Sequence, residues 1–139
     1  MSTEAQTEKK VEGKVGSNLA MLDKSHQYTI DAAGKTLGRI ASEVAKALMG
    51  KTRADYTPHI NSGVVVTVQN ASKLYIREKK RLSKTYTRYS GYPGGLKKQS
   101  LSQMVTQKGN AGPLRKAVER MLPRNTMRTV RMKNLKIND

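Results

Sequence analysis

Five consecutive β-branched residues, Val64–Val68, constrain the fold more than any other segment of this chain. A strand with one solvated face alternates apolar and polar residues, whereas a continuous β-branched run is typical of a strand covered on both faces. Parallel sheets of α/β proteins contain such strands because helices pack on the sheet. The run therefore favours an α/β fold.

The segment before this run supplies the first two parts of a βαβ unit. A short strand is predicted at Tyr28–Ile30, because Asp31 and Gly34 follow it. The next apolar residues share one helical face, and they are Leu37, Ile40, Ala41, Val44 and Leu48. Gly50 then stands where a helix C-terminal glycine belongs. Strand, helix and buried strand together predict a βαβ unit with a right-handed crossover.

The second half of the chain contains several shorter candidate elements. Its best-marked helix spans 113–122, where Pro113 suits the first turn and Pro123 ends the helix. Met121 and Leu122 complete the apolar stripe of this helix, so we expect both in the core. The other predicted elements are strands at Lys73–Arg77, Lys84–Tyr89 and Leu135–Ile137, a basic turn at Glu78–Arg81, an irregular loop at Gly91–Gly95 and a helix at Ser100–Lys108 capped by Ser100.

Residues 1–25 differ in composition from the rest of the chain. They are rich in Ser, Thr, Glu, Lys and Gly without periodicity, which predicts a flexible N-terminal extension before a single domain at 26–139. The extension has four acids, four bases and no apolar stretch, unlike a signal or transit peptide. No apolar run approaches the ~20 residues of a membrane span. These features predict a cytoplasmic protein without a membrane partner.

Positive charge is concentrated in the second half of the chain. The formal net charge is +17, and residues 73–139 carry 18 Lys and Arg against three acids. The first 72 residues are nearly balanced, with nine basic residues and seven acids. Self-repulsion of this size is unfavourable in a folded domain, and a polyanionic partner is the usual reason to retain it. The asymmetry predicts nucleic-acid binding, chiefly through the C-terminal half.

Four of the six tyrosines are interleaved with basic residues in one short span, at Tyr75, Tyr86, Tyr89 and Tyr92. A tyrosine ring can stack on an unpaired base while Lys and Arg contact phosphates. A basic cluster such as Lys79–Arg81 is by itself more often a solvated face, and Tyr86 could instead pack on the sheet. The combination of aromatic and basic residues favours nucleic-acid contact in this span.

Enzymatic alternatives have weaker support. Gly34-Lys35-Thr36 resembles the end of a Walker A phosphate loop, but Thr29 stands where that motif requires its first glycine. The lysine could still contact a nucleic-acid phosphate, as could Arg39. His26 and His59 have no second ligand at metal spacing, and cysteine is absent. We therefore expect no catalytic site, metal, cofactor or small-molecule substrate; a nucleotide-dependent RNA-processing factor is the alternative.

A DNA-binding regulator is a third class of function. It would require a recognition helix whose side chains suit base edges. The helix at 113–122 presents Arg115, Lys116 and Arg120, and such side chains suit phosphates better. A DNA-binding regulator therefore has little support in this helix.

Five segments, in this order and spacing, closely resemble the bacterial form of ribosomal protein L13, a large-subunit family. They are Asp31–Ala41, Tyr56–His59, Val68–Lys73, Ser90–Lys97 and Ala117–Asn125. One such segment alone would be unspecific, whereas the ordered set is highly specific. The resemblance implies a three-layer α/β/α domain around a small, mostly parallel sheet. It also implies a structural, nonenzymatic constituent of the large ribosomal subunit that binds large-subunit ribosomal RNA, adjoins other ribosomal proteins and supports early assembly.

The resemblance also implies positions of RNA contact. The matched positions are Lys35, Arg39, His59, Lys73, Lys84, Tyr86, the loop Gly91–Lys97 and Arg124. With the basic and aromatic residues added, the candidate RNA-binding residues are Lys35, Arg39, His59, Lys73, Lys79, Lys80, Arg81, Lys84, Tyr86, Arg88, Tyr89, Tyr92, Gly94, Gly95, Lys97, Lys98, Arg115, Arg120, Arg124 and Arg128.

Overall fold

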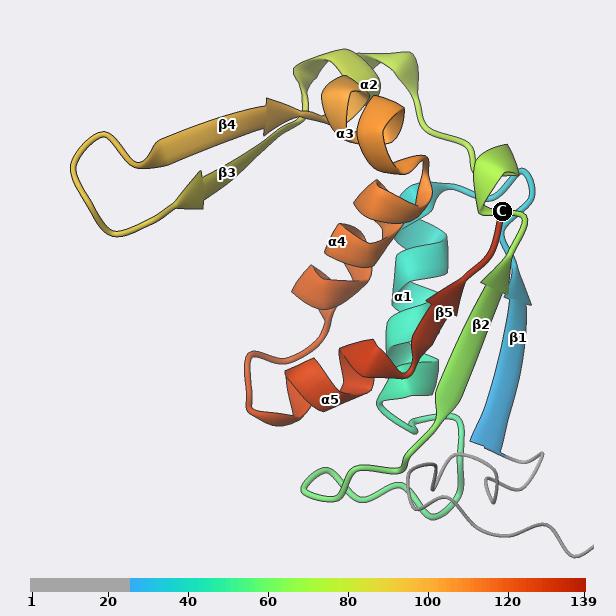
Figure 1. The fold of residues 1–139 in the computed structure, drawn as a ribbon. Coiled ribbons are helices and arrows are strands. Elements are labelled where there is room, and N and C mark those ends of the chain that lie inside the picture. Colours follow the sequence, from blue (N-terminus) through green and yellow to red (C-terminus); the bar gives the residue numbers. More distant parts are fainter. Residues whose placement is uncertain (1–25) are drawn as a thin grey trace, which may run out of the picture.

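A small parallel sheet forms one side of the body of the computed structural model, which describes residues 26–139 (Figure 1). The predicted extension, residues 1–25, lies outside the described residues. The strands of the sheet, in spatial order, are β1 (Gln27–Asp31), β2 (Val65–Gln69) and β5 (Leu135–Ile137). Both neighbouring pairs are parallel, so the predicted α/β class with a small parallel sheet is confirmed.

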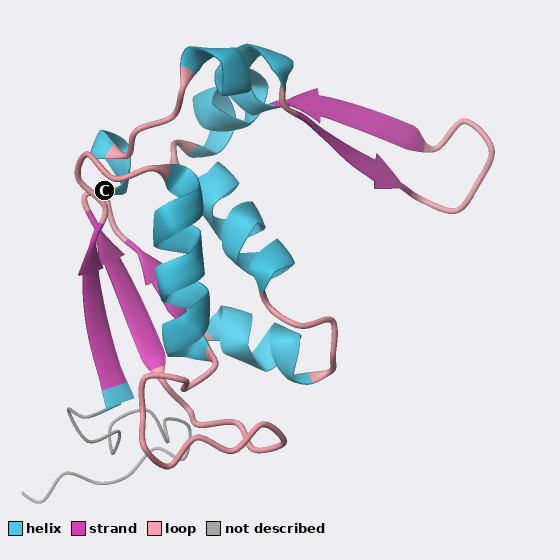
Figure 2. Ribbon diagram, turned by 180° about the vertical axis from the view of Figure 1, so that it is seen from behind, coloured by secondary structure: helices cyan, strands magenta, loops and turns pink. Residues whose placement is uncertain are grey.

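Helix α1 (Leu37–Leu48) connects β1 to β2 and packs on one face of the sheet (Figure 2). All residues of its predicted apolar stripe are buried, and Ile40 and Val44 have no exposed surface. They share one core with Val66 and Val68 of β2. Two adjacent parallel strands joined by a packed helix confirm the predicted βαβ unit.

The two faces of the sheet differ in polarity. One register row joins Ile30, Val68 and Ile137, which face the core side. The preceding row joins Thr29, Thr67 and Lys136, and its side chains point to the opposite face because successive residues alternate. The threonine of β1 and the lysine of β5 are exposed. Within residues 26–139, the core therefore lies between the sheet and its helices on the α1 side.

Helix α4 (Ala111–Met121) packs along α1 and completes this core with Leu114 and Val118, both fully buried. It begins before the predicted start at Pro113, which lies in the first turn where no N–H is needed. Met121 is 41% exposed, so its prediction as a core residue is wrong. The backbone becomes extended at Leu122, and this residue takes the buried position with 2% exposure.

Three further elements differ from the sequence-based expectation. The segment Lys73–Arg77 is not a strand: the 3-10 turn η2 (Ala71–Lys73) overlaps its start, and a single bridge pairs Tyr75 with Thr36. The predicted turn at 78–81 belongs to helix α2 (Glu78–Ser83), which has no buried residue. Helix α5 (Met127–Lys133) was not expected. Helices this short lack a clear apolar period and depend on their surroundings.

An antiparallel hairpin of β3 (Thr85–Tyr89) and β4 (Leu96–Ser100) projects away from the helices (Figures 1 and 2). The sequence Leu-Lys-Lys-Gln-Ser has no β-branched or aromatic residue, so β4 was not predicted and depends on pairing with β3. Helix α3 (Leu101–Lys108) follows directly. The predicted cap is confirmed, because Ser100 Oγ accepts the N–H of Gln103 at 3.2 Å and Gln103 Oε1 accepts the N–H of Ser100 at 3.0 Å.

Candidate RNA interface

The hairpin places basic residues directly opposite one another. Arg88 pairs with Lys97, and Thr87 pairs with Lys98. All four residues are exposed. Like charges opposite each other destabilise a strand pair, and an isolated two-stranded hairpin is only marginally stable. A polyanion along the hairpin would remove this repulsion.

Glycines shape the tip of the hairpin. Gly94 has a φ of +76°, in the left-handed region that favours glycine. The N–H of Gly95 donates to the carbonyl of Tyr92 at 3.0 Å, and a Cβ at Gly95 would collide with Ser90 Oγ. This tight turn leaves Tyr92 76% exposed and Tyr89 61% exposed. The tip therefore presents two aromatic rings next to the basic strands.

Tyr86 lies at the base of the hairpin between two cations. Its ring centroid is 5.3 Å from Cζ of Arg120 and 5.9 Å from Nζ of Lys84, within the range of cation–π contacts. Burial raises the pKa of Tyr86, and the charge of Arg120 opposes this shift. The fold thus brings together three predicted residues: Tyr86 of β3, Lys84 just before β3, and Arg120 of α4. The contact between Tyr86 and Arg120 joins the hairpin to the body.

A groove of about 410 Å³ opens beside the first turn of α1. Arg39 of α1 and Lys80 of α2 line it together with Tyr75 and Arg77 from the connecting segment. The sequence pattern marked Tyr75, but neither Tyr75 nor Arg77 was among the candidate residues. Tyr75 is 52% exposed, so a ring and three cations share one concave surface.

An adjacent groove of about 450 Å³ contains two more predicted residues, Lys73 and Arg81. Tyr75 and Ile76 line both grooves, so the two grooves adjoin each other. Asn110, just before α4, donates from Nδ2 to the carbonyl of Ser72 at 2.9 Å, and this hydrogen bond joins two residues that line the groove. The tertiary fold thus gathers basic residues from η2 and α2 at one end of the molecule.

The turn at Gly34-Lys35-Thr36 is not organised as a phosphate loop. The N–H of Ala33 donates to Asp31 Oδ1 at 3.1 Å. The N–H groups of Gly34 and Lys35 donate to the backbone carbonyls of Lys73 and Ala32, at 3.1 and 3.2 Å. A phosphate loop needs such groups free to bind the ligand. Lys35 Nζ lies 3.5 Å from Glu43 Oε2 in an exposed ion pair. Its ammonium group remains accessible to a solvent-side phosphate.

A third basic groove, of about 400 Å³, lies between α3, α4 and α5. The basic residues that line it are Lys108, Arg115, Lys116 and Arg128. Arg115 Nη2 donates to the carbonyl of Met132 at 3.4 Å. Lys116 Nζ donates to Glu119 Oε2 at 2.8 Å, and this hydrogen bond lowers the pKa of Glu119. The groove brings together the predicted Arg115 and Arg128, and adds two lysines that were not predicted.

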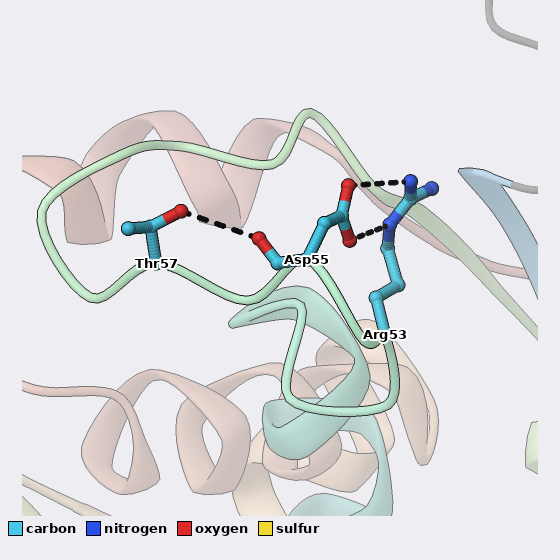
Figure 3. Close-up of polar contacts among 3 residues, drawn as sticks. All are labelled: Arg53, Asp55 and Thr57. Carbon is cyan, nitrogen blue, oxygen red and sulfur yellow. Dashed lines mark hydrogen bonds and ion pairs between the residues drawn. The ribbon is translucent and has the colours of Figure 1, made fainter.

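The loop after α1 is stabilised by its own polar contacts (Figure 3). Arg53 donates from Nε and Nη2 to the two carboxylate oxygens of Asp55, both at 2.7 Å. These hydrogen bonds lower the pKa of Asp55 and raise that of Arg53. Thr57 Oγ1 donates to the carbonyl of Asp55 at 3.2 Å. The contacts shape the segment that leads to His59.

His59 and Arg124 belong to a different region from the hairpin. Pro58 and Pro123 line one groove, so the segments that carry these two residues are neighbours. In Figure 1 the loop after α1 lies near the start of β2, at the end of the molecule away from the hairpin. The candidate residues therefore lie in several separate regions rather than on one continuous surface.

Within the described residues, no group of three or more His, Cys, Asp or Glu could hold a metal ion. No helix in that part of the chain is long and apolar enough to cross a membrane. The three basic grooves described above each contain Lys and Arg side chains, and Tyr75 lines two of them.

Comparison with known proteins shows which proteins this chain is similar to. The large ribosomal subunit protein uL13 of Alcanivorax borkumensis is 42% identical over 110 residues, which cover 79% of this chain and 77% of the relative. The protein of that name from Thermotoga maritima is 46% identical over 110 residues, covering 79% and 73%. That of Syntrophus aciditrophicus is 43% identical over 110 residues, covering 79% and 77%. The family described as Ribosomal protein L13 matches residues 25–139, the whole parallel-sheet domain with its basic hairpin, and this chain belongs to that family.

Proposed function

We propose that this chain is a structural protein of the large ribosomal subunit that binds large-subunit ribosomal RNA and supports early subunit assembly. It works in the cytoplasm as part of the ribosome, beside other large-subunit proteins. The observation that carries this proposal is the projecting hairpin, with Arg88 opposite Lys97 and two exposed tyrosines at its tip. Membership of the L13 family supports the same role.

The hairpin suits a folded RNA because of its shape and chemistry. Its two strands extend beyond the core, so both of their faces can lie against RNA. Lys97 and Lys98 lie on opposite faces of the hairpin because adjacent strand residues alternate. Phosphates of two nearby RNA segments can therefore be neutralised at once, while Tyr89 and Tyr92 offer stacking surfaces for unpaired bases.

The RNA-processing alternative has no support in the geometry. A nucleotide-dependent factor would need free backbone N–H groups after β1, but those of residues 33–35 are engaged within the protein. Convergent acidic residues for a metal ion are also absent from residues 26–139. The function supported best is therefore a structural one.

Sucrose-gradient sedimentation of a tagged chain tests the proposal. The chain should co-migrate with the large subunit after a high-salt wash, which removes proteins that are held only by non-specific charge contacts. A double variant, Arg88→Gln with Lys97→Gln, should shift the chain toward the top of the gradient. Lys136→Gln, which removes an exposed charge from the polar face of the sheet, is the matched control. A parent chain found only in the unbound fractions would contradict the proposal.

A further inference from the structure

One arginine lies inside the protein instead of on its basic surface. Arg131 of α5 is 3% exposed. Its Nε has no hydrogen-bond partner, and Nη2 has a single weak contact, with Met127 Sδ at 3.9 Å. None of the carboxylates described in residues 26–139 forms an ion pair with it. The guanidinium group is therefore buried without a counter-charge.

Such a burial is costly. A buried charge without a partner loses hydration and gains nothing in return. An arginine cannot relieve this cost by releasing its proton, since it remains charged in proteins. An anion that enters from outside would supply both the missing charge and acceptors for the free N–H groups.

Arg131 lines a groove through which an anion can reach it. The groove measures about 500 Å³ and lies between the end of α1, the loop after it and the connection from α4 to α5. Lys51 is a second cation on its wall, and Tyr56 and Met121 supply apolar surface. These two side chains are 36% and 41% exposed. Its volume is in the range of small-ligand sites, roughly 300–1,000 Å³.

We propose that this groove binds one unpaired nucleotide of RNA, with its phosphate on Arg131 and Lys51 and its base against Tyr56 and Met121. Cations beside apolar walls match the two parts of a nucleotide, whereas an inorganic anion would use only the cations. An unpaired nucleotide suits the groove best, because a base within a duplex must first be unpaired and unstacked to meet these walls. The inference rests on the proposed RNA-binding function and adds a site distant from the hairpin.

The test follows the methyl group of Met121 by NMR in the full chain labelled with 13C-methyl methionine. Its resonance is assigned with a Met121→Leu variant, and the probe is the tetranucleotide rU4. Saturable movement of this resonance is expected in the parent protein. Arg131→Met should weaken the affinity reported by Met121 about tenfold, the loss expected for one charge-assisted hydrogen bond. Lys136→Met, which removes a charge on the other face of the sheet, should leave that affinity unchanged.

Thermal melting is the folding control. Arg131→Met should melt at or above the temperature of the parent protein, because it removes an uncompensated buried charge. If that variant fails to fold, Lys51→Gln, at an exposed position, is measured in its place and should weaken the same affinity about threefold.

Several outcomes would overturn the inference. One is binding of rU4, measured by the fluorescence anisotropy of a labelled strand, without a shift of the Met121 methyl resonance. Another is equal affinity at this methyl in the parent and Arg131→Met proteins. A third is an equal response to an acidic peptide of four Asp residues, which would make the ligand a carboxylate. A parent protein that binds neither rU4 nor duplex RNA would instead contradict the proposed function itself.

Discussion

At the scale of single residues, Asp31 shows how one side chain decides the character of a turn. Its Oδ1 accepts two hydrogen bonds, one from Asn70 Nδ2 at 2.9 Å and one from the N–H of Ala33 at 3.1 Å. The carboxylate therefore joins the ends of β1 and β2 and occupies a backbone donor that an anion would need. These hydrogen bonds, first that from Asn70 and then that from Ala33, lower the pKa of Asp31.

The lowered pKa of Asp31 predicts a specific acid dependence of stability. The hydrogen bonds to the carboxylate contribute fully above the unfolded pKa of about 4, and their contribution is lost as pH falls through the folded value. Asp31→Asn removes this titration. Urea unfolding between about pH 5 and pH 2 should show a larger loss of unfolding free energy for the parent than for the variant. Parallel curves for the two proteins would show that the carboxylate does not titrate differently on folding.

Met121 and Leu122 form a matched pair for testing burial at the end of α4. Leu122→Ala should reduce the free energy of unfolding by about 2–5 kcal/mol, because the side chain is 2% exposed and its removal leaves a cavity. Met121→Ala should cost roughly 1 kcal/mol, because much of that side chain already contacts solvent. Chemical denaturation of both variants measures the difference. Equal losses would mean that Met121 is as buried in solution as its neighbour.

At the scale of elements, the hairpin and the body have separate tasks. The body owes its stability to the core between the sheet, α1 and α4. The hairpin has no residue in that core and contacts the body at its base, where the ring of Tyr86 meets the guanidinium of Arg120 and Gln99 Nε2 donates to Gln107 Oε1 at 2.8 Å. Changes at its tip should therefore alter binding without altering the core.

Gly94→Val tests this separation of tasks. The left-handed φ of +76° strains a β-branched residue, although open space surrounds the position. We expect weaker binding to large-subunit ribosomal RNA, with circular dichroism and melting temperature close to those of the parent. Thr87→Val, which suits an exposed strand position and preserves charge, is the control and should bind normally. Normal RNA binding by Gly94→Val would show that the loop is only a connector.

At the scale of the whole molecule, the charge of +17 should dominate binding. If about six phosphates are neutralised, a slope near −0.9 per contact predicts an affinity loss on the order of 10³ for a fourfold rise in salt. Filter binding or anisotropy between about 50 and 200 mM salt measures this slope. A flat titration would exclude a binding mode based on charge.

Much of the fold could be predicted from local patterns. The β-branched run at Val64–Val68 and the stripe that starts at Leu37 identified the parallel sheet and its helix, because burial selects residue type at a fixed period. Pro113 and Pro123 predicted the position of α4, and Ser100 predicted the start of α3. A strand was predicted at Lys84–Tyr89, which contains β3, and closely spaced glycines with Pro93 predicted the loop at Gly91–Gly95; these signals depend on only a few adjacent residues.

Other features depended on distant partners and only the tertiary structure decided them. Strand β4 exists because β3 pairs with it, although its own sequence has little strand preference. The burial of Arg131 and the exposure of Met121 depend on how α4, α5 and the loop after α1 meet, which no local period encodes. The sequence by itself determined the class of fold and the net charge of +17, which predicts a polyanionic partner. Tertiary packing decided which cations share a groove, because that depends on contacts between residues far apart in the chain.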